Sequence, residues 1–128
     1  MSETAPAMRD PALRTVAMPA DANANGDIFG GGLLAQMDLA GAVPAMRRAR
    51  GRVATVAVQA MSFHRPVLIG DLVSCYSDIT KVGRTSLTVM VETWVERHFG
   101  GSTEKVTEGM FTYVAIDTNG RKRPVPPA

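Results

Sequence analysis

The chain has 128 residues, of which 45% are hydrophobic and 20% are charged, a composition typical of one folded domain. Fourteen Lys and Arg residues against twelve Asp and Glu residues give a net charge of +2, which is too small an excess to indicate a nucleic-acid partner. The single cysteine excludes an intramolecular disulfide and favours a reducing compartment. The start of the chain shows no signal-peptide pattern, and no apolar run approaches the roughly 20 residues that span a bilayer. We therefore expect a cytoplasmic protein without a membrane partner.

The first third of the chain predicts a strand, a loop and a helix. Residues 1–12 are rich in Pro and Ala and are expected to be a loose N-terminus. A short strand is predicted at 13–18, and the turn formers at 19–26 predict an irregular loop. Pro44 lacks an N–H group and is expected to kink or end the helix, which then resumes towards Arg50. One buried helix face is indicated by apolar and small residues at spacings of three and four, namely Leu33, Leu34, Met37, Gly41 and Ala42.

After Gly51 the pattern changes from helical to extended. Gly83 and Arg84 are predicted to form the tip of a hairpin. Long strands after a single helix predict an α+β domain over residues 13–117, in which an antiparallel sheet packs on the helix, followed by a basic, Pro-rich tail at 118–128. Because one helix cannot cover five strands, the open sheet face and edge are expected to meet a second copy of the chain. The four predicted strands are 53–61, Leu72–Val82, 85–97 and 104–116.

Asp38 is the first candidate catalytic residue. It follows Leu34 by four residues and precedes Gly41 by three, so it shares a helix face with apolar and small neighbours. A carboxylate on the inward side of a helix is costly unless it is paired or hydrogen-bonded. The alternative to a catalytic acid or base is a structural Asp that bonds the sheet backbone or lies at the boundary with solvent.

A polar loop runs into a glycine-rich helix start at residues 23–31, which read NANGDIFGG. The first N–H groups of a helix lack intrahelical partners and, with the helix dipole, stabilise developing negative charge. Glycine at positions 30 and 31 lets a ligand approach the backbone closely. Asn23 or Asn25 can supply a side-chain donor. The alternative is an Asx-type turn with Asp27 as the helix N-cap, which we prefer for Asp27 itself.

Other titratable residues give weaker signals. Basic residues cluster at 47–52 and 121–123, either as solvated faces or as a local phosphate site. His64 is interpreted as a turn residue and His98 as a surface residue, and their spacing does not suggest metal ligands, so no metal site is expected. Cys75 is interpreted as a buried, inert thiol.

The sequence resembles the YciA-type acyl-CoA thioesterases, a bacterial branch of the acyl-CoA thioester hydrolases in the hotdog superfamily. The resemblance lies in residues 13–42, 51–73 and 81–95 and extends over nearly the whole chain. NANGDIFGG, followed by QMD at residues 36–38, is its most specific part. The resemblance implies a hotdog fold, in which one central helix is wrapped by a five-stranded antiparallel sheet. It also implies a homodimer with one continuous sheet, commonly assembled into a trimer of dimers.

The resemblance further implies the reaction, which is hydrolysis of an acyl-CoA thioester to coenzyme A and a carboxylic acid. By position, Asp38 corresponds to the family's helix aspartate and Asn23 to its loop asparagine, and the two would come from opposite protomers. The turn at Gly30 and Gly31 corresponds to the oxyanion-binding turn, and Thr55 to a polar residue near the attacking water. No cofactor is expected, because thiolate is a good leaving group and coenzyme A is part of the substrate and product.

Candidates for the phosphates of coenzyme A are basic or hydroxyl side chains. Arg84, with Thr85 and Ser86, is the first candidate, and Arg121 with Arg123 is the second. Gly32 departs from the family pattern, because relatives often carry a bulkier residue there, commonly Trp, so a wider pocket floor is expected. Pro44 is the other departure, since a plain helical residue is expected at that position.

Two rival functions remain open from the sequence. A non-catalytic acyl-CoA-binding module would share the fold and would bind the substrate without turnover. A hotdog dehydratase would need a histidine paired with a helix acid, and no histidine lies between Asn23 and Asp38.

Overall fold

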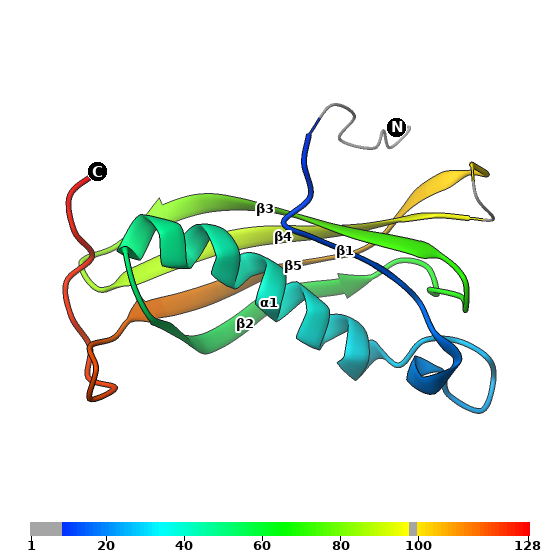
Figure 1. Ribbon diagram of the computed structural model, residues 1–128, viewed down its shortest axis with the longest axis horizontal. Coiled ribbons are helices and arrows are strands. Elements are labelled where there is room, and N and C mark those ends of the chain that lie inside the picture. The colour runs from blue at the N-terminus through cyan, green and yellow to red at the C-terminus, as the bar shows by residue number, and fades with distance from the viewer. Residues whose placement is uncertain (1–8, 98–99) are drawn as a thin grey trace.

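The computed structural model describes residues 9–97 and 100–128. A short strand and a 3-10 turn precede one long helix, and four long strands follow it (Figure 1). The predicted order of elements is confirmed, although the strand predicted to begin at Thr85 begins one residue later. His98, predicted to be a surface residue, lies outside the described residues. The elements are β1 (Leu13–Val16), η1 (Pro19–Asp21), α1 (Gly30–Ala49), β2 (Val53–Phe63), β3 (Leu72–Val82), β4 (Ser86–Glu96) and β5 (Thr103–Ala115).

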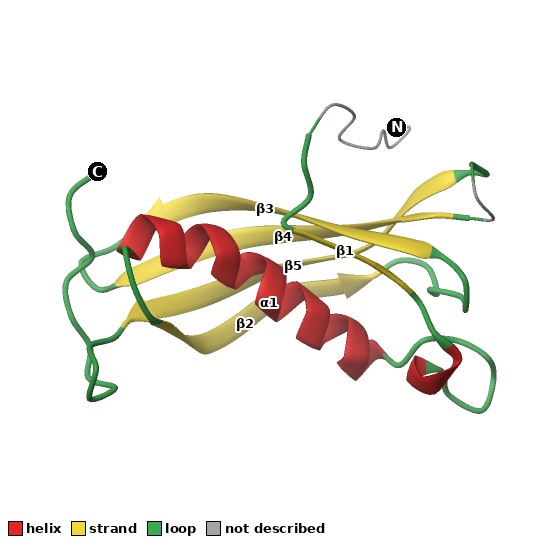
Figure 2. Cartoon of the chain, viewed as in Figure 1, coloured by secondary structure: helices red, strands yellow, loops and turns green. Residues whose placement is uncertain are grey.

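All five strands form one antiparallel sheet in the order β1-β3-β4-β5-β2. α1 crosses one face of this sheet and contacts every strand (Figure 2). Since β3, β4 and β5 follow one another by short connections, they lie side by side as successive antiparallel neighbours. The predicted α+β class, with one helix on a five-stranded antiparallel sheet, is confirmed.

α1 lies on the sheet through one stripe of apolar and small residues. The stripe repeats at spacings of three and four, which places its members on one side of a helix. Small side chains in the stripe let the helix backbone approach the sheet closely. Arg50 adopts a left-handed conformation with φ 53° and ends the helix. The buried members of the stripe are Leu33, Met37, Ala40, Gly41, Ala45 and Ala49.

Pro44 does not end the helix, contrary to one of the two outcomes predicted for it. α1 continues through this residue to Ala49. Pro44 has no N–H group to donate to the carbonyl of Ala40, four residues before it. The hydroxyl of Ser77 on β3 donates to that carbonyl oxygen at 2.9 Å instead. A side chain of the sheet therefore pairs the acceptor that the proline leaves open.

Cys75 lies in the core between α1 and the sheet and has no exposed surface. Its sulfur is 3.4 Å from the hydroxyl oxygen of Thr93. Burial raises the pKa of this thiol, because the charged thiolate loses its hydration there. The expected burial of Cys75 is confirmed, and the neutral form is favoured.

β2 lies at one edge of the sheet and is the least covered of the four long strands. Its residues Val56, Val58 and Phe63 are 53%, 41% and 56% exposed. Its register with β5 shifts between Thr55 and Ala57 and again between Gln59 and Ser62. Such an apolar edge invites pairing with another strand.

No described helix is long and apolar enough to cross a membrane.

Both ends of the described chain are held by hydrogen bonds to β3 and its hairpin. The stretch predicted to be loose includes Ala12, whose N–H donates to the carbonyl of Cys75 at 2.9 Å, and Arg9, which pairs with Asp78 at 2.9 Å. In the Pro-rich tail, the N–H of Val125 donates to the carbonyl of Arg84 at 2.8 Å. Residues 9–12 therefore extend along β3, and the tail packs against the β3–β4 hairpin.

Candidate active site

Asp38 is half-buried on the side of α1 that faces β2. The hydroxyl of Thr55 donates to the Oδ1 atom of Asp38 at 2.6 Å. This partner is a side chain, so the structural alternative of an Asp bonded to the sheet backbone does not describe the carboxylate. A charge-assisted bond of this length fixes the orientation of Asp38 and leaves its second oxygen for other chemistry.

Tyr113 holds the main chain of the same residue. Its hydroxyl donates to the carbonyl oxygen of Asp38 at 2.7 Å. Burial, with the charge of Asp38 nearby, raises the pKa of Tyr113, so the hydroxyl remains a donor. Tyr113 and Thr55 are paired neighbours on β5 and β2. Tyr113 was not predicted from the sequence, in which only the small residue Gly41, one turn after Asp38, signals a close neighbour there.

The loop before α1 is organised by Asn23. Its Oδ1 accepts the N–H of Asn25 at 2.9 Å and the N–H of Asp27 at 3.2 Å, which is the Asx-type turn given above as the alternative for this loop. Asp27 is not the helix N-cap, because α1 begins at Gly30 and its N-cap residue is Phe29, which makes no side-chain capping bond. The cap prediction fails because Asp27 forms a β-bridge with Leu68, outside the helix.

The helix start is fixed by backbone bonds to the β2–β3 connection. The N–H of Ile28 donates to the carbonyl of Val67 at 2.9 Å. The connection is held in turn by the carboxylate of Asp71, which is 2% exposed, accepts the N–H of Leu68 at 2.8 Å and pairs with Arg97. The ion pair of Asp71 and Arg97 therefore stabilises the β2–β3 connection, and this connection holds the backbone just before α1.

Asn23 and Gly30 line one cavity of about 370 Å³. His64 lines it too, beyond the end of β2 and 3.5 Å from a carboxylate oxygen of Glu108. Sequence reasoning interpreted His64 only as a turn residue and missed this neighbourhood. A hotdog dehydratase requires a histidine paired with an acid on the helix. The carboxylate beside His64 is on β5 instead, so the described residues of one chain do not form that pair.

Asp38 does not line the Asn23 cavity. Gly31 and Asp38 lie on one side of α1 but are seven residues apart, which is about 10 Å along a helix that rises 1.5 Å per residue. The isolated chain therefore brings Asn23 together with the glycine turn, and Asp38 together with Thr55. It does not bring these two halves into contact.

The predicted phosphate ligands lie at the far end of α1 (Figure 1). Arg84 and Thr85 form the tip of a tight hairpin, which is closed by the N–H of Gly83 donating to the carbonyl of Ser86 at 2.8 Å. Arg84 and Arg121 are exposed. The guanidinium of Arg123 instead donates to the carbonyls of Ile116 at 3.0 Å and Ala49 at 2.9 Å.

One long helix packed across a single antiparallel sheet, with a carboxylate on the helix and a glycine-rich turn at its start, defines the hotdog fold of thioesterases. Residues 25–98, more than half of the chain, match the family described as the thioesterase superfamily. The acyl-CoA thioester hydrolase YciA of Salmonella typhimurium is 52% identical over 89% of this chain and 88% of its own. The chain belongs to this superfamily and, within it, to the YciA-type acyl-CoA thioester hydrolases, as the sequence predicted.

Solved structures agree with this assignment. The hexameric thioesterase of Yersinia pestis superposes with a TM-score of 0.89 at 50% identity, covering 93% of this chain and 97% of its own. The hexameric hotdog-fold thioesterase of Campylobacter jejuni gives a TM-score of 0.88 at 43% identity, covering 94% and 92%.

Proposed function

We propose that this protein is a hydrolase that cleaves acyl-CoA thioesters to coenzyme A and a carboxylic acid. The observation that carries the proposal is the half-buried carboxylate of Asp38, which the hydroxyl of Thr55 orients at 2.6 Å. Family membership points to the same reaction, since the relatives described above are named as thioesterases or acyl-CoA thioester hydrolases.

The chemistry follows from the groups on the two halves of the site. The N–H of Gly31 holds the thioester oxygen as it gains negative charge. Asp38 either takes a proton from water, whose oxygen attacks the carbonyl carbon, or attacks directly and forms an anhydride that water opens. In both routes the C–S bond breaks and coenzyme A leaves as a thiolate, so the reaction needs no cofactor. Asn23 positions the water or the carbonyl.

The site is completed, in this proposal, by two protomers. Asp38 of one chain meets Asn23 and Gly31 of another, because within one chain about 10 Å of helix separates Gly31 from Asp38. The apolar edge formed by Val56, Val58 and Phe63 of β2 supports pairing of the two sheets into one. Three such dimers form a hexamer, the assembly named for the relatives in Yersinia pestis and Campylobacter jejuni.

Coenzyme A binds, in this proposal, through its phosphates at the far end of α1. Arg84 at the hairpin tip is the first ligand, with Thr85 and Ser86 beside it, and Arg121 is the second. Arg123 ranks below these two arginines, because its guanidinium already donates to two backbone carbonyls. We assign the enzyme to the cytoplasm, because a reducing compartment keeps the single free cysteine of this chain as a thiol.

The experiment that tests the function is release of free thiol from acyl-CoA by the wild type and by Asp38→Asn. The wild type should turn over, and the isosteric variant should lose nearly all kcat while keeping the same thermal unfolding temperature. Binding of acyl-CoA without thiol release would identify a binding module instead. Wild-type kcat in a folded Asp38→Asn variant would remove Asp38 from the mechanism.

A subunit-mixing experiment tests the shared site. Inactive Asn23→Ala and inactive Asp38→Ala chains are refolded together in equal amounts. If each site takes Asn23 from one chain and Asp38 from the other, mixed dimers contain one intact site and activity returns in part. Activity that stays at the level of the separate variants would place both residues in one chain.

A further inference from the structure

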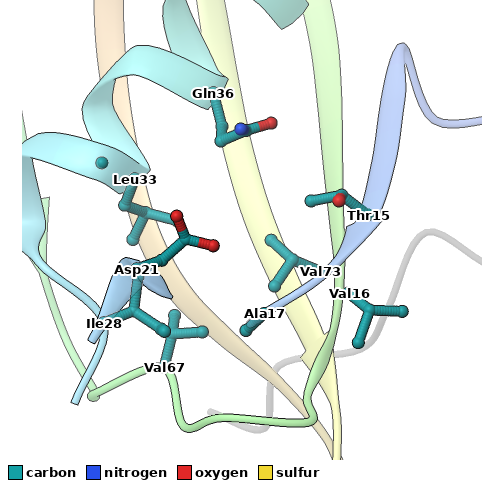
Figure 3. Close-up of a pocket in the computed structure, with 10 residues that line it drawn as sticks. Thr15, Val16, Ala17, Asp21, Ile28, Leu33, Gln36, Val67 and Val73 are labelled. Atoms are coloured by element: carbon teal, nitrogen blue, oxygen red, sulfur yellow. The ribbon is translucent and has the colours of Figure 1, made fainter. Parts of the chain in front are cut away.

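A second cavity lies on the other flank of α1 from Asp38. It measures about 60 Å³, and residues of β1, η1, β3, the first turns of α1 and the β2–β3 connection line it (Figure 3). Gln36 lines it, and at 3.6 residues per turn Gln36 and Asp38 point about 160° apart around the helix. The cavity shares the side chains of Ile28, Leu33 and Val67 with the cavity of Asn23 and Gly30. It is therefore separate from the carboxylate but adjoins the glycine turn.

Gly32 connects this cavity to the glycine turn. A Cβ atom on Gly32 would meet no heavy atom within 4 Å, so the space beside its α-carbon is open. Gly31, whose N–H is assigned to the thioester oxygen above, is the preceding residue. An acyl chain that leaves a carbonyl held at Gly31 can therefore enter the cavity past Gly32.

The cavity is apolar on one side and polar on the other. Ile28, Leu33 and Val67 form its apolar wall. Thr15, Asp21 and Gln36 are its polar members, and within residues 9–97 and 100–128 the side chains of Asp21 and Gln36 make no hydrogen bond or ion pair. Figure 3 shows the carboxylate of Asp21 turned towards the middle of the ring of lining side chains. Asp21 is exposed, so water solvates its carboxylate in the free protein, and a ligand that carries a hydrogen-bond donor can replace that water beside the apolar wall.

We propose that this cavity is the acyl subsite and that it selects short acyl groups whose far end carries an O–H or N–H donor. The inference rests on the proposed thioesterase function and adds a substrate class to it. A cavity of about 60 Å³ holds about four water-sized groups, since each needs roughly 10–15 Å³. The part of a 4-hydroxybutyryl group beyond its carbonyl carbon is of this size. Asp21 accepts its hydroxyl and repels the carboxylate of a succinyl group.

The test compares kcat/KM on acetyl-, butyryl-, 4-hydroxybutyryl- and succinyl-CoA. The wild type should prefer 4-hydroxybutyryl-CoA to butyryl-CoA by about tenfold, the effect of one hydrogen bond to a charged group, and should disfavour succinyl-CoA. Asp21→Ala should bring the first two substrates to near equality and relieve the penalty on succinyl-CoA. Asp10→Ala, which removes an exposed carboxylate away from this cavity, should leave every ratio unchanged.

A filling substitution tests the passage. Gly32→Leu should lower kcat/KM on both four-carbon substrates at least tenfold more than on acetyl-CoA, because the acetyl group ends before the cavity. Wild-type turnover of butyryl- and 4-hydroxybutyryl-CoA at the same rate, or an unchanged ratio in Asp21→Ala, would overturn the subsite. If Gly32→Leu also loses acetyl-CoA turnover, the Asp21→Ala ratio decides alone. A wild type that cleaves none of the four thioesters would overturn the proposed function instead.

Discussion

Gly41 and Tyr113 meet where α1 crosses β5. A Cβ atom on Gly41 would lie 2.3 Å from the hydroxyl oxygen of Tyr113, and 3.1 and 3.2 Å from two of its ring carbons. This close approach brings the hydroxyl within 2.7 Å of the carbonyl oxygen of Asp38. The helix segment that carries Asp38 is thus held against the sheet by two residues. Gly41 leaves room for the ring of Tyr113, and the hydroxyl of Tyr113 bonds the helix backbone.

We expect Gly41→Ala to destabilise the protein, although alanine favours a helix over glycine by about 1 kcal/mol. The added methyl group must displace the buried ring of Tyr113. Tyr113→Phe alone should cost about 1 kcal/mol for the lost hydrogen bond, but in the Gly41→Ala background it should restore part of the stability. Thermal unfolding of the four proteins measures this coupling. Gly32→Ala is the matched control, because the added methyl group meets nothing there, and additive effects at 41 and 113 would contradict the contact.

Ser77 and Pro44 should also be coupled in stability. Ser77→Ala removes the donor to the carbonyl of Ala40, and an unpaired buried acceptor costs about 1–3 kcal/mol. In a Pro44→Ala background, the new N–H group at position 44 can bond the same carbonyl, so Ser77→Ala should cost less. Thermal unfolding of the two single variants and the double variant tests this. Equal losses in both backgrounds would show that Ser77 stabilises the fold by some other contact.

Thr55→Val should lower kcat about tenfold with little change in KM. The substitution keeps the shape of the side chain but removes the donor to Asp38, and hydrogen bonds to charged groups are worth about 1.5–3 kcal/mol. Because the bond orients the reacting group rather than binding the substrate, the loss should fall on kcat. Thr112→Val on β5 is the control, because it makes the same chemical change at a residue that does not bond Asp38. Unaltered kcat in Thr55→Val would mean that Asp38 is oriented without it.

Arg84→Ala should raise KM for acyl-CoA more than it lowers kcat. A phosphate contact remote from the reacting carbon contributes the same binding energy to ground state and transition state, and its loss should cost about tenfold or more. The same acyl group on a truncated thiol without the nucleotide should react almost equally with both proteins. Arg9→Ala is the charge-matched control. An equal loss on both substrates would mean that Arg84 supports structure, and Arg121 or residues 47–52 would then become the phosphate candidates.

The free energy of unfolding should decrease as the pH is lowered, because Glu108 becomes protonated. The hydrogen bond from Lys105 holds the pKa of this carboxyl below its ordinary value, and His64 lowers the pKa to a lesser degree. A depressed folded pKa contributes stability that is present above the unfolded pKa and is lost as pH falls through the folded one. Glu108→Gln should therefore have a lower Tm than the wild type at pH 7, and the difference should shrink below about pH 4. A difference that is constant from pH 7 to 3 would contradict this, and Asp10→Asn should show no difference at either pH.

The order of elements, Asp38 and the glycine turn could be predicted from local patterns, whereas Thr55 and the choice of Asn23 over Asn25 came from the family resemblance. Periodicity at spacings of three and four places Asp38 beside a buried helix face, and glycines at 30 and 31 mark the turn. What the sequence could not supply were pairings between distant segments. Tyr113 reaches Asp38 from 75 residues away, and no local pattern encodes that contact.

The errors have the same origin. Pro44 was expected to kink or end the helix because its effect on α1 is local, while the compensating hydroxyl of Ser77 belongs to another element. Asp27 reads as an N-cap because its type and position fit, while its β-bridge to Leu68 depends on the folded β2–β3 connection. Arg123 was a phosphate candidate by its charge, and the carbonyls that its guanidinium bonds, at the ends of α1 and β5, could not be predicted from the sequence.

The burial of Cys75 gives any thiol-based assay of this enzyme a built-in check. The single thiol of the chain is shielded beneath α1 and is held in its neutral form, so a colorimetric thiol reagent should count only the coenzyme that turnover releases. One extra equivalent of thiol per subunit, appearing without substrate, would report that the chain has opened. A variant that has lost activity through unfolding can thereby be told apart, in the same cuvette, from one that has lost only its chemistry.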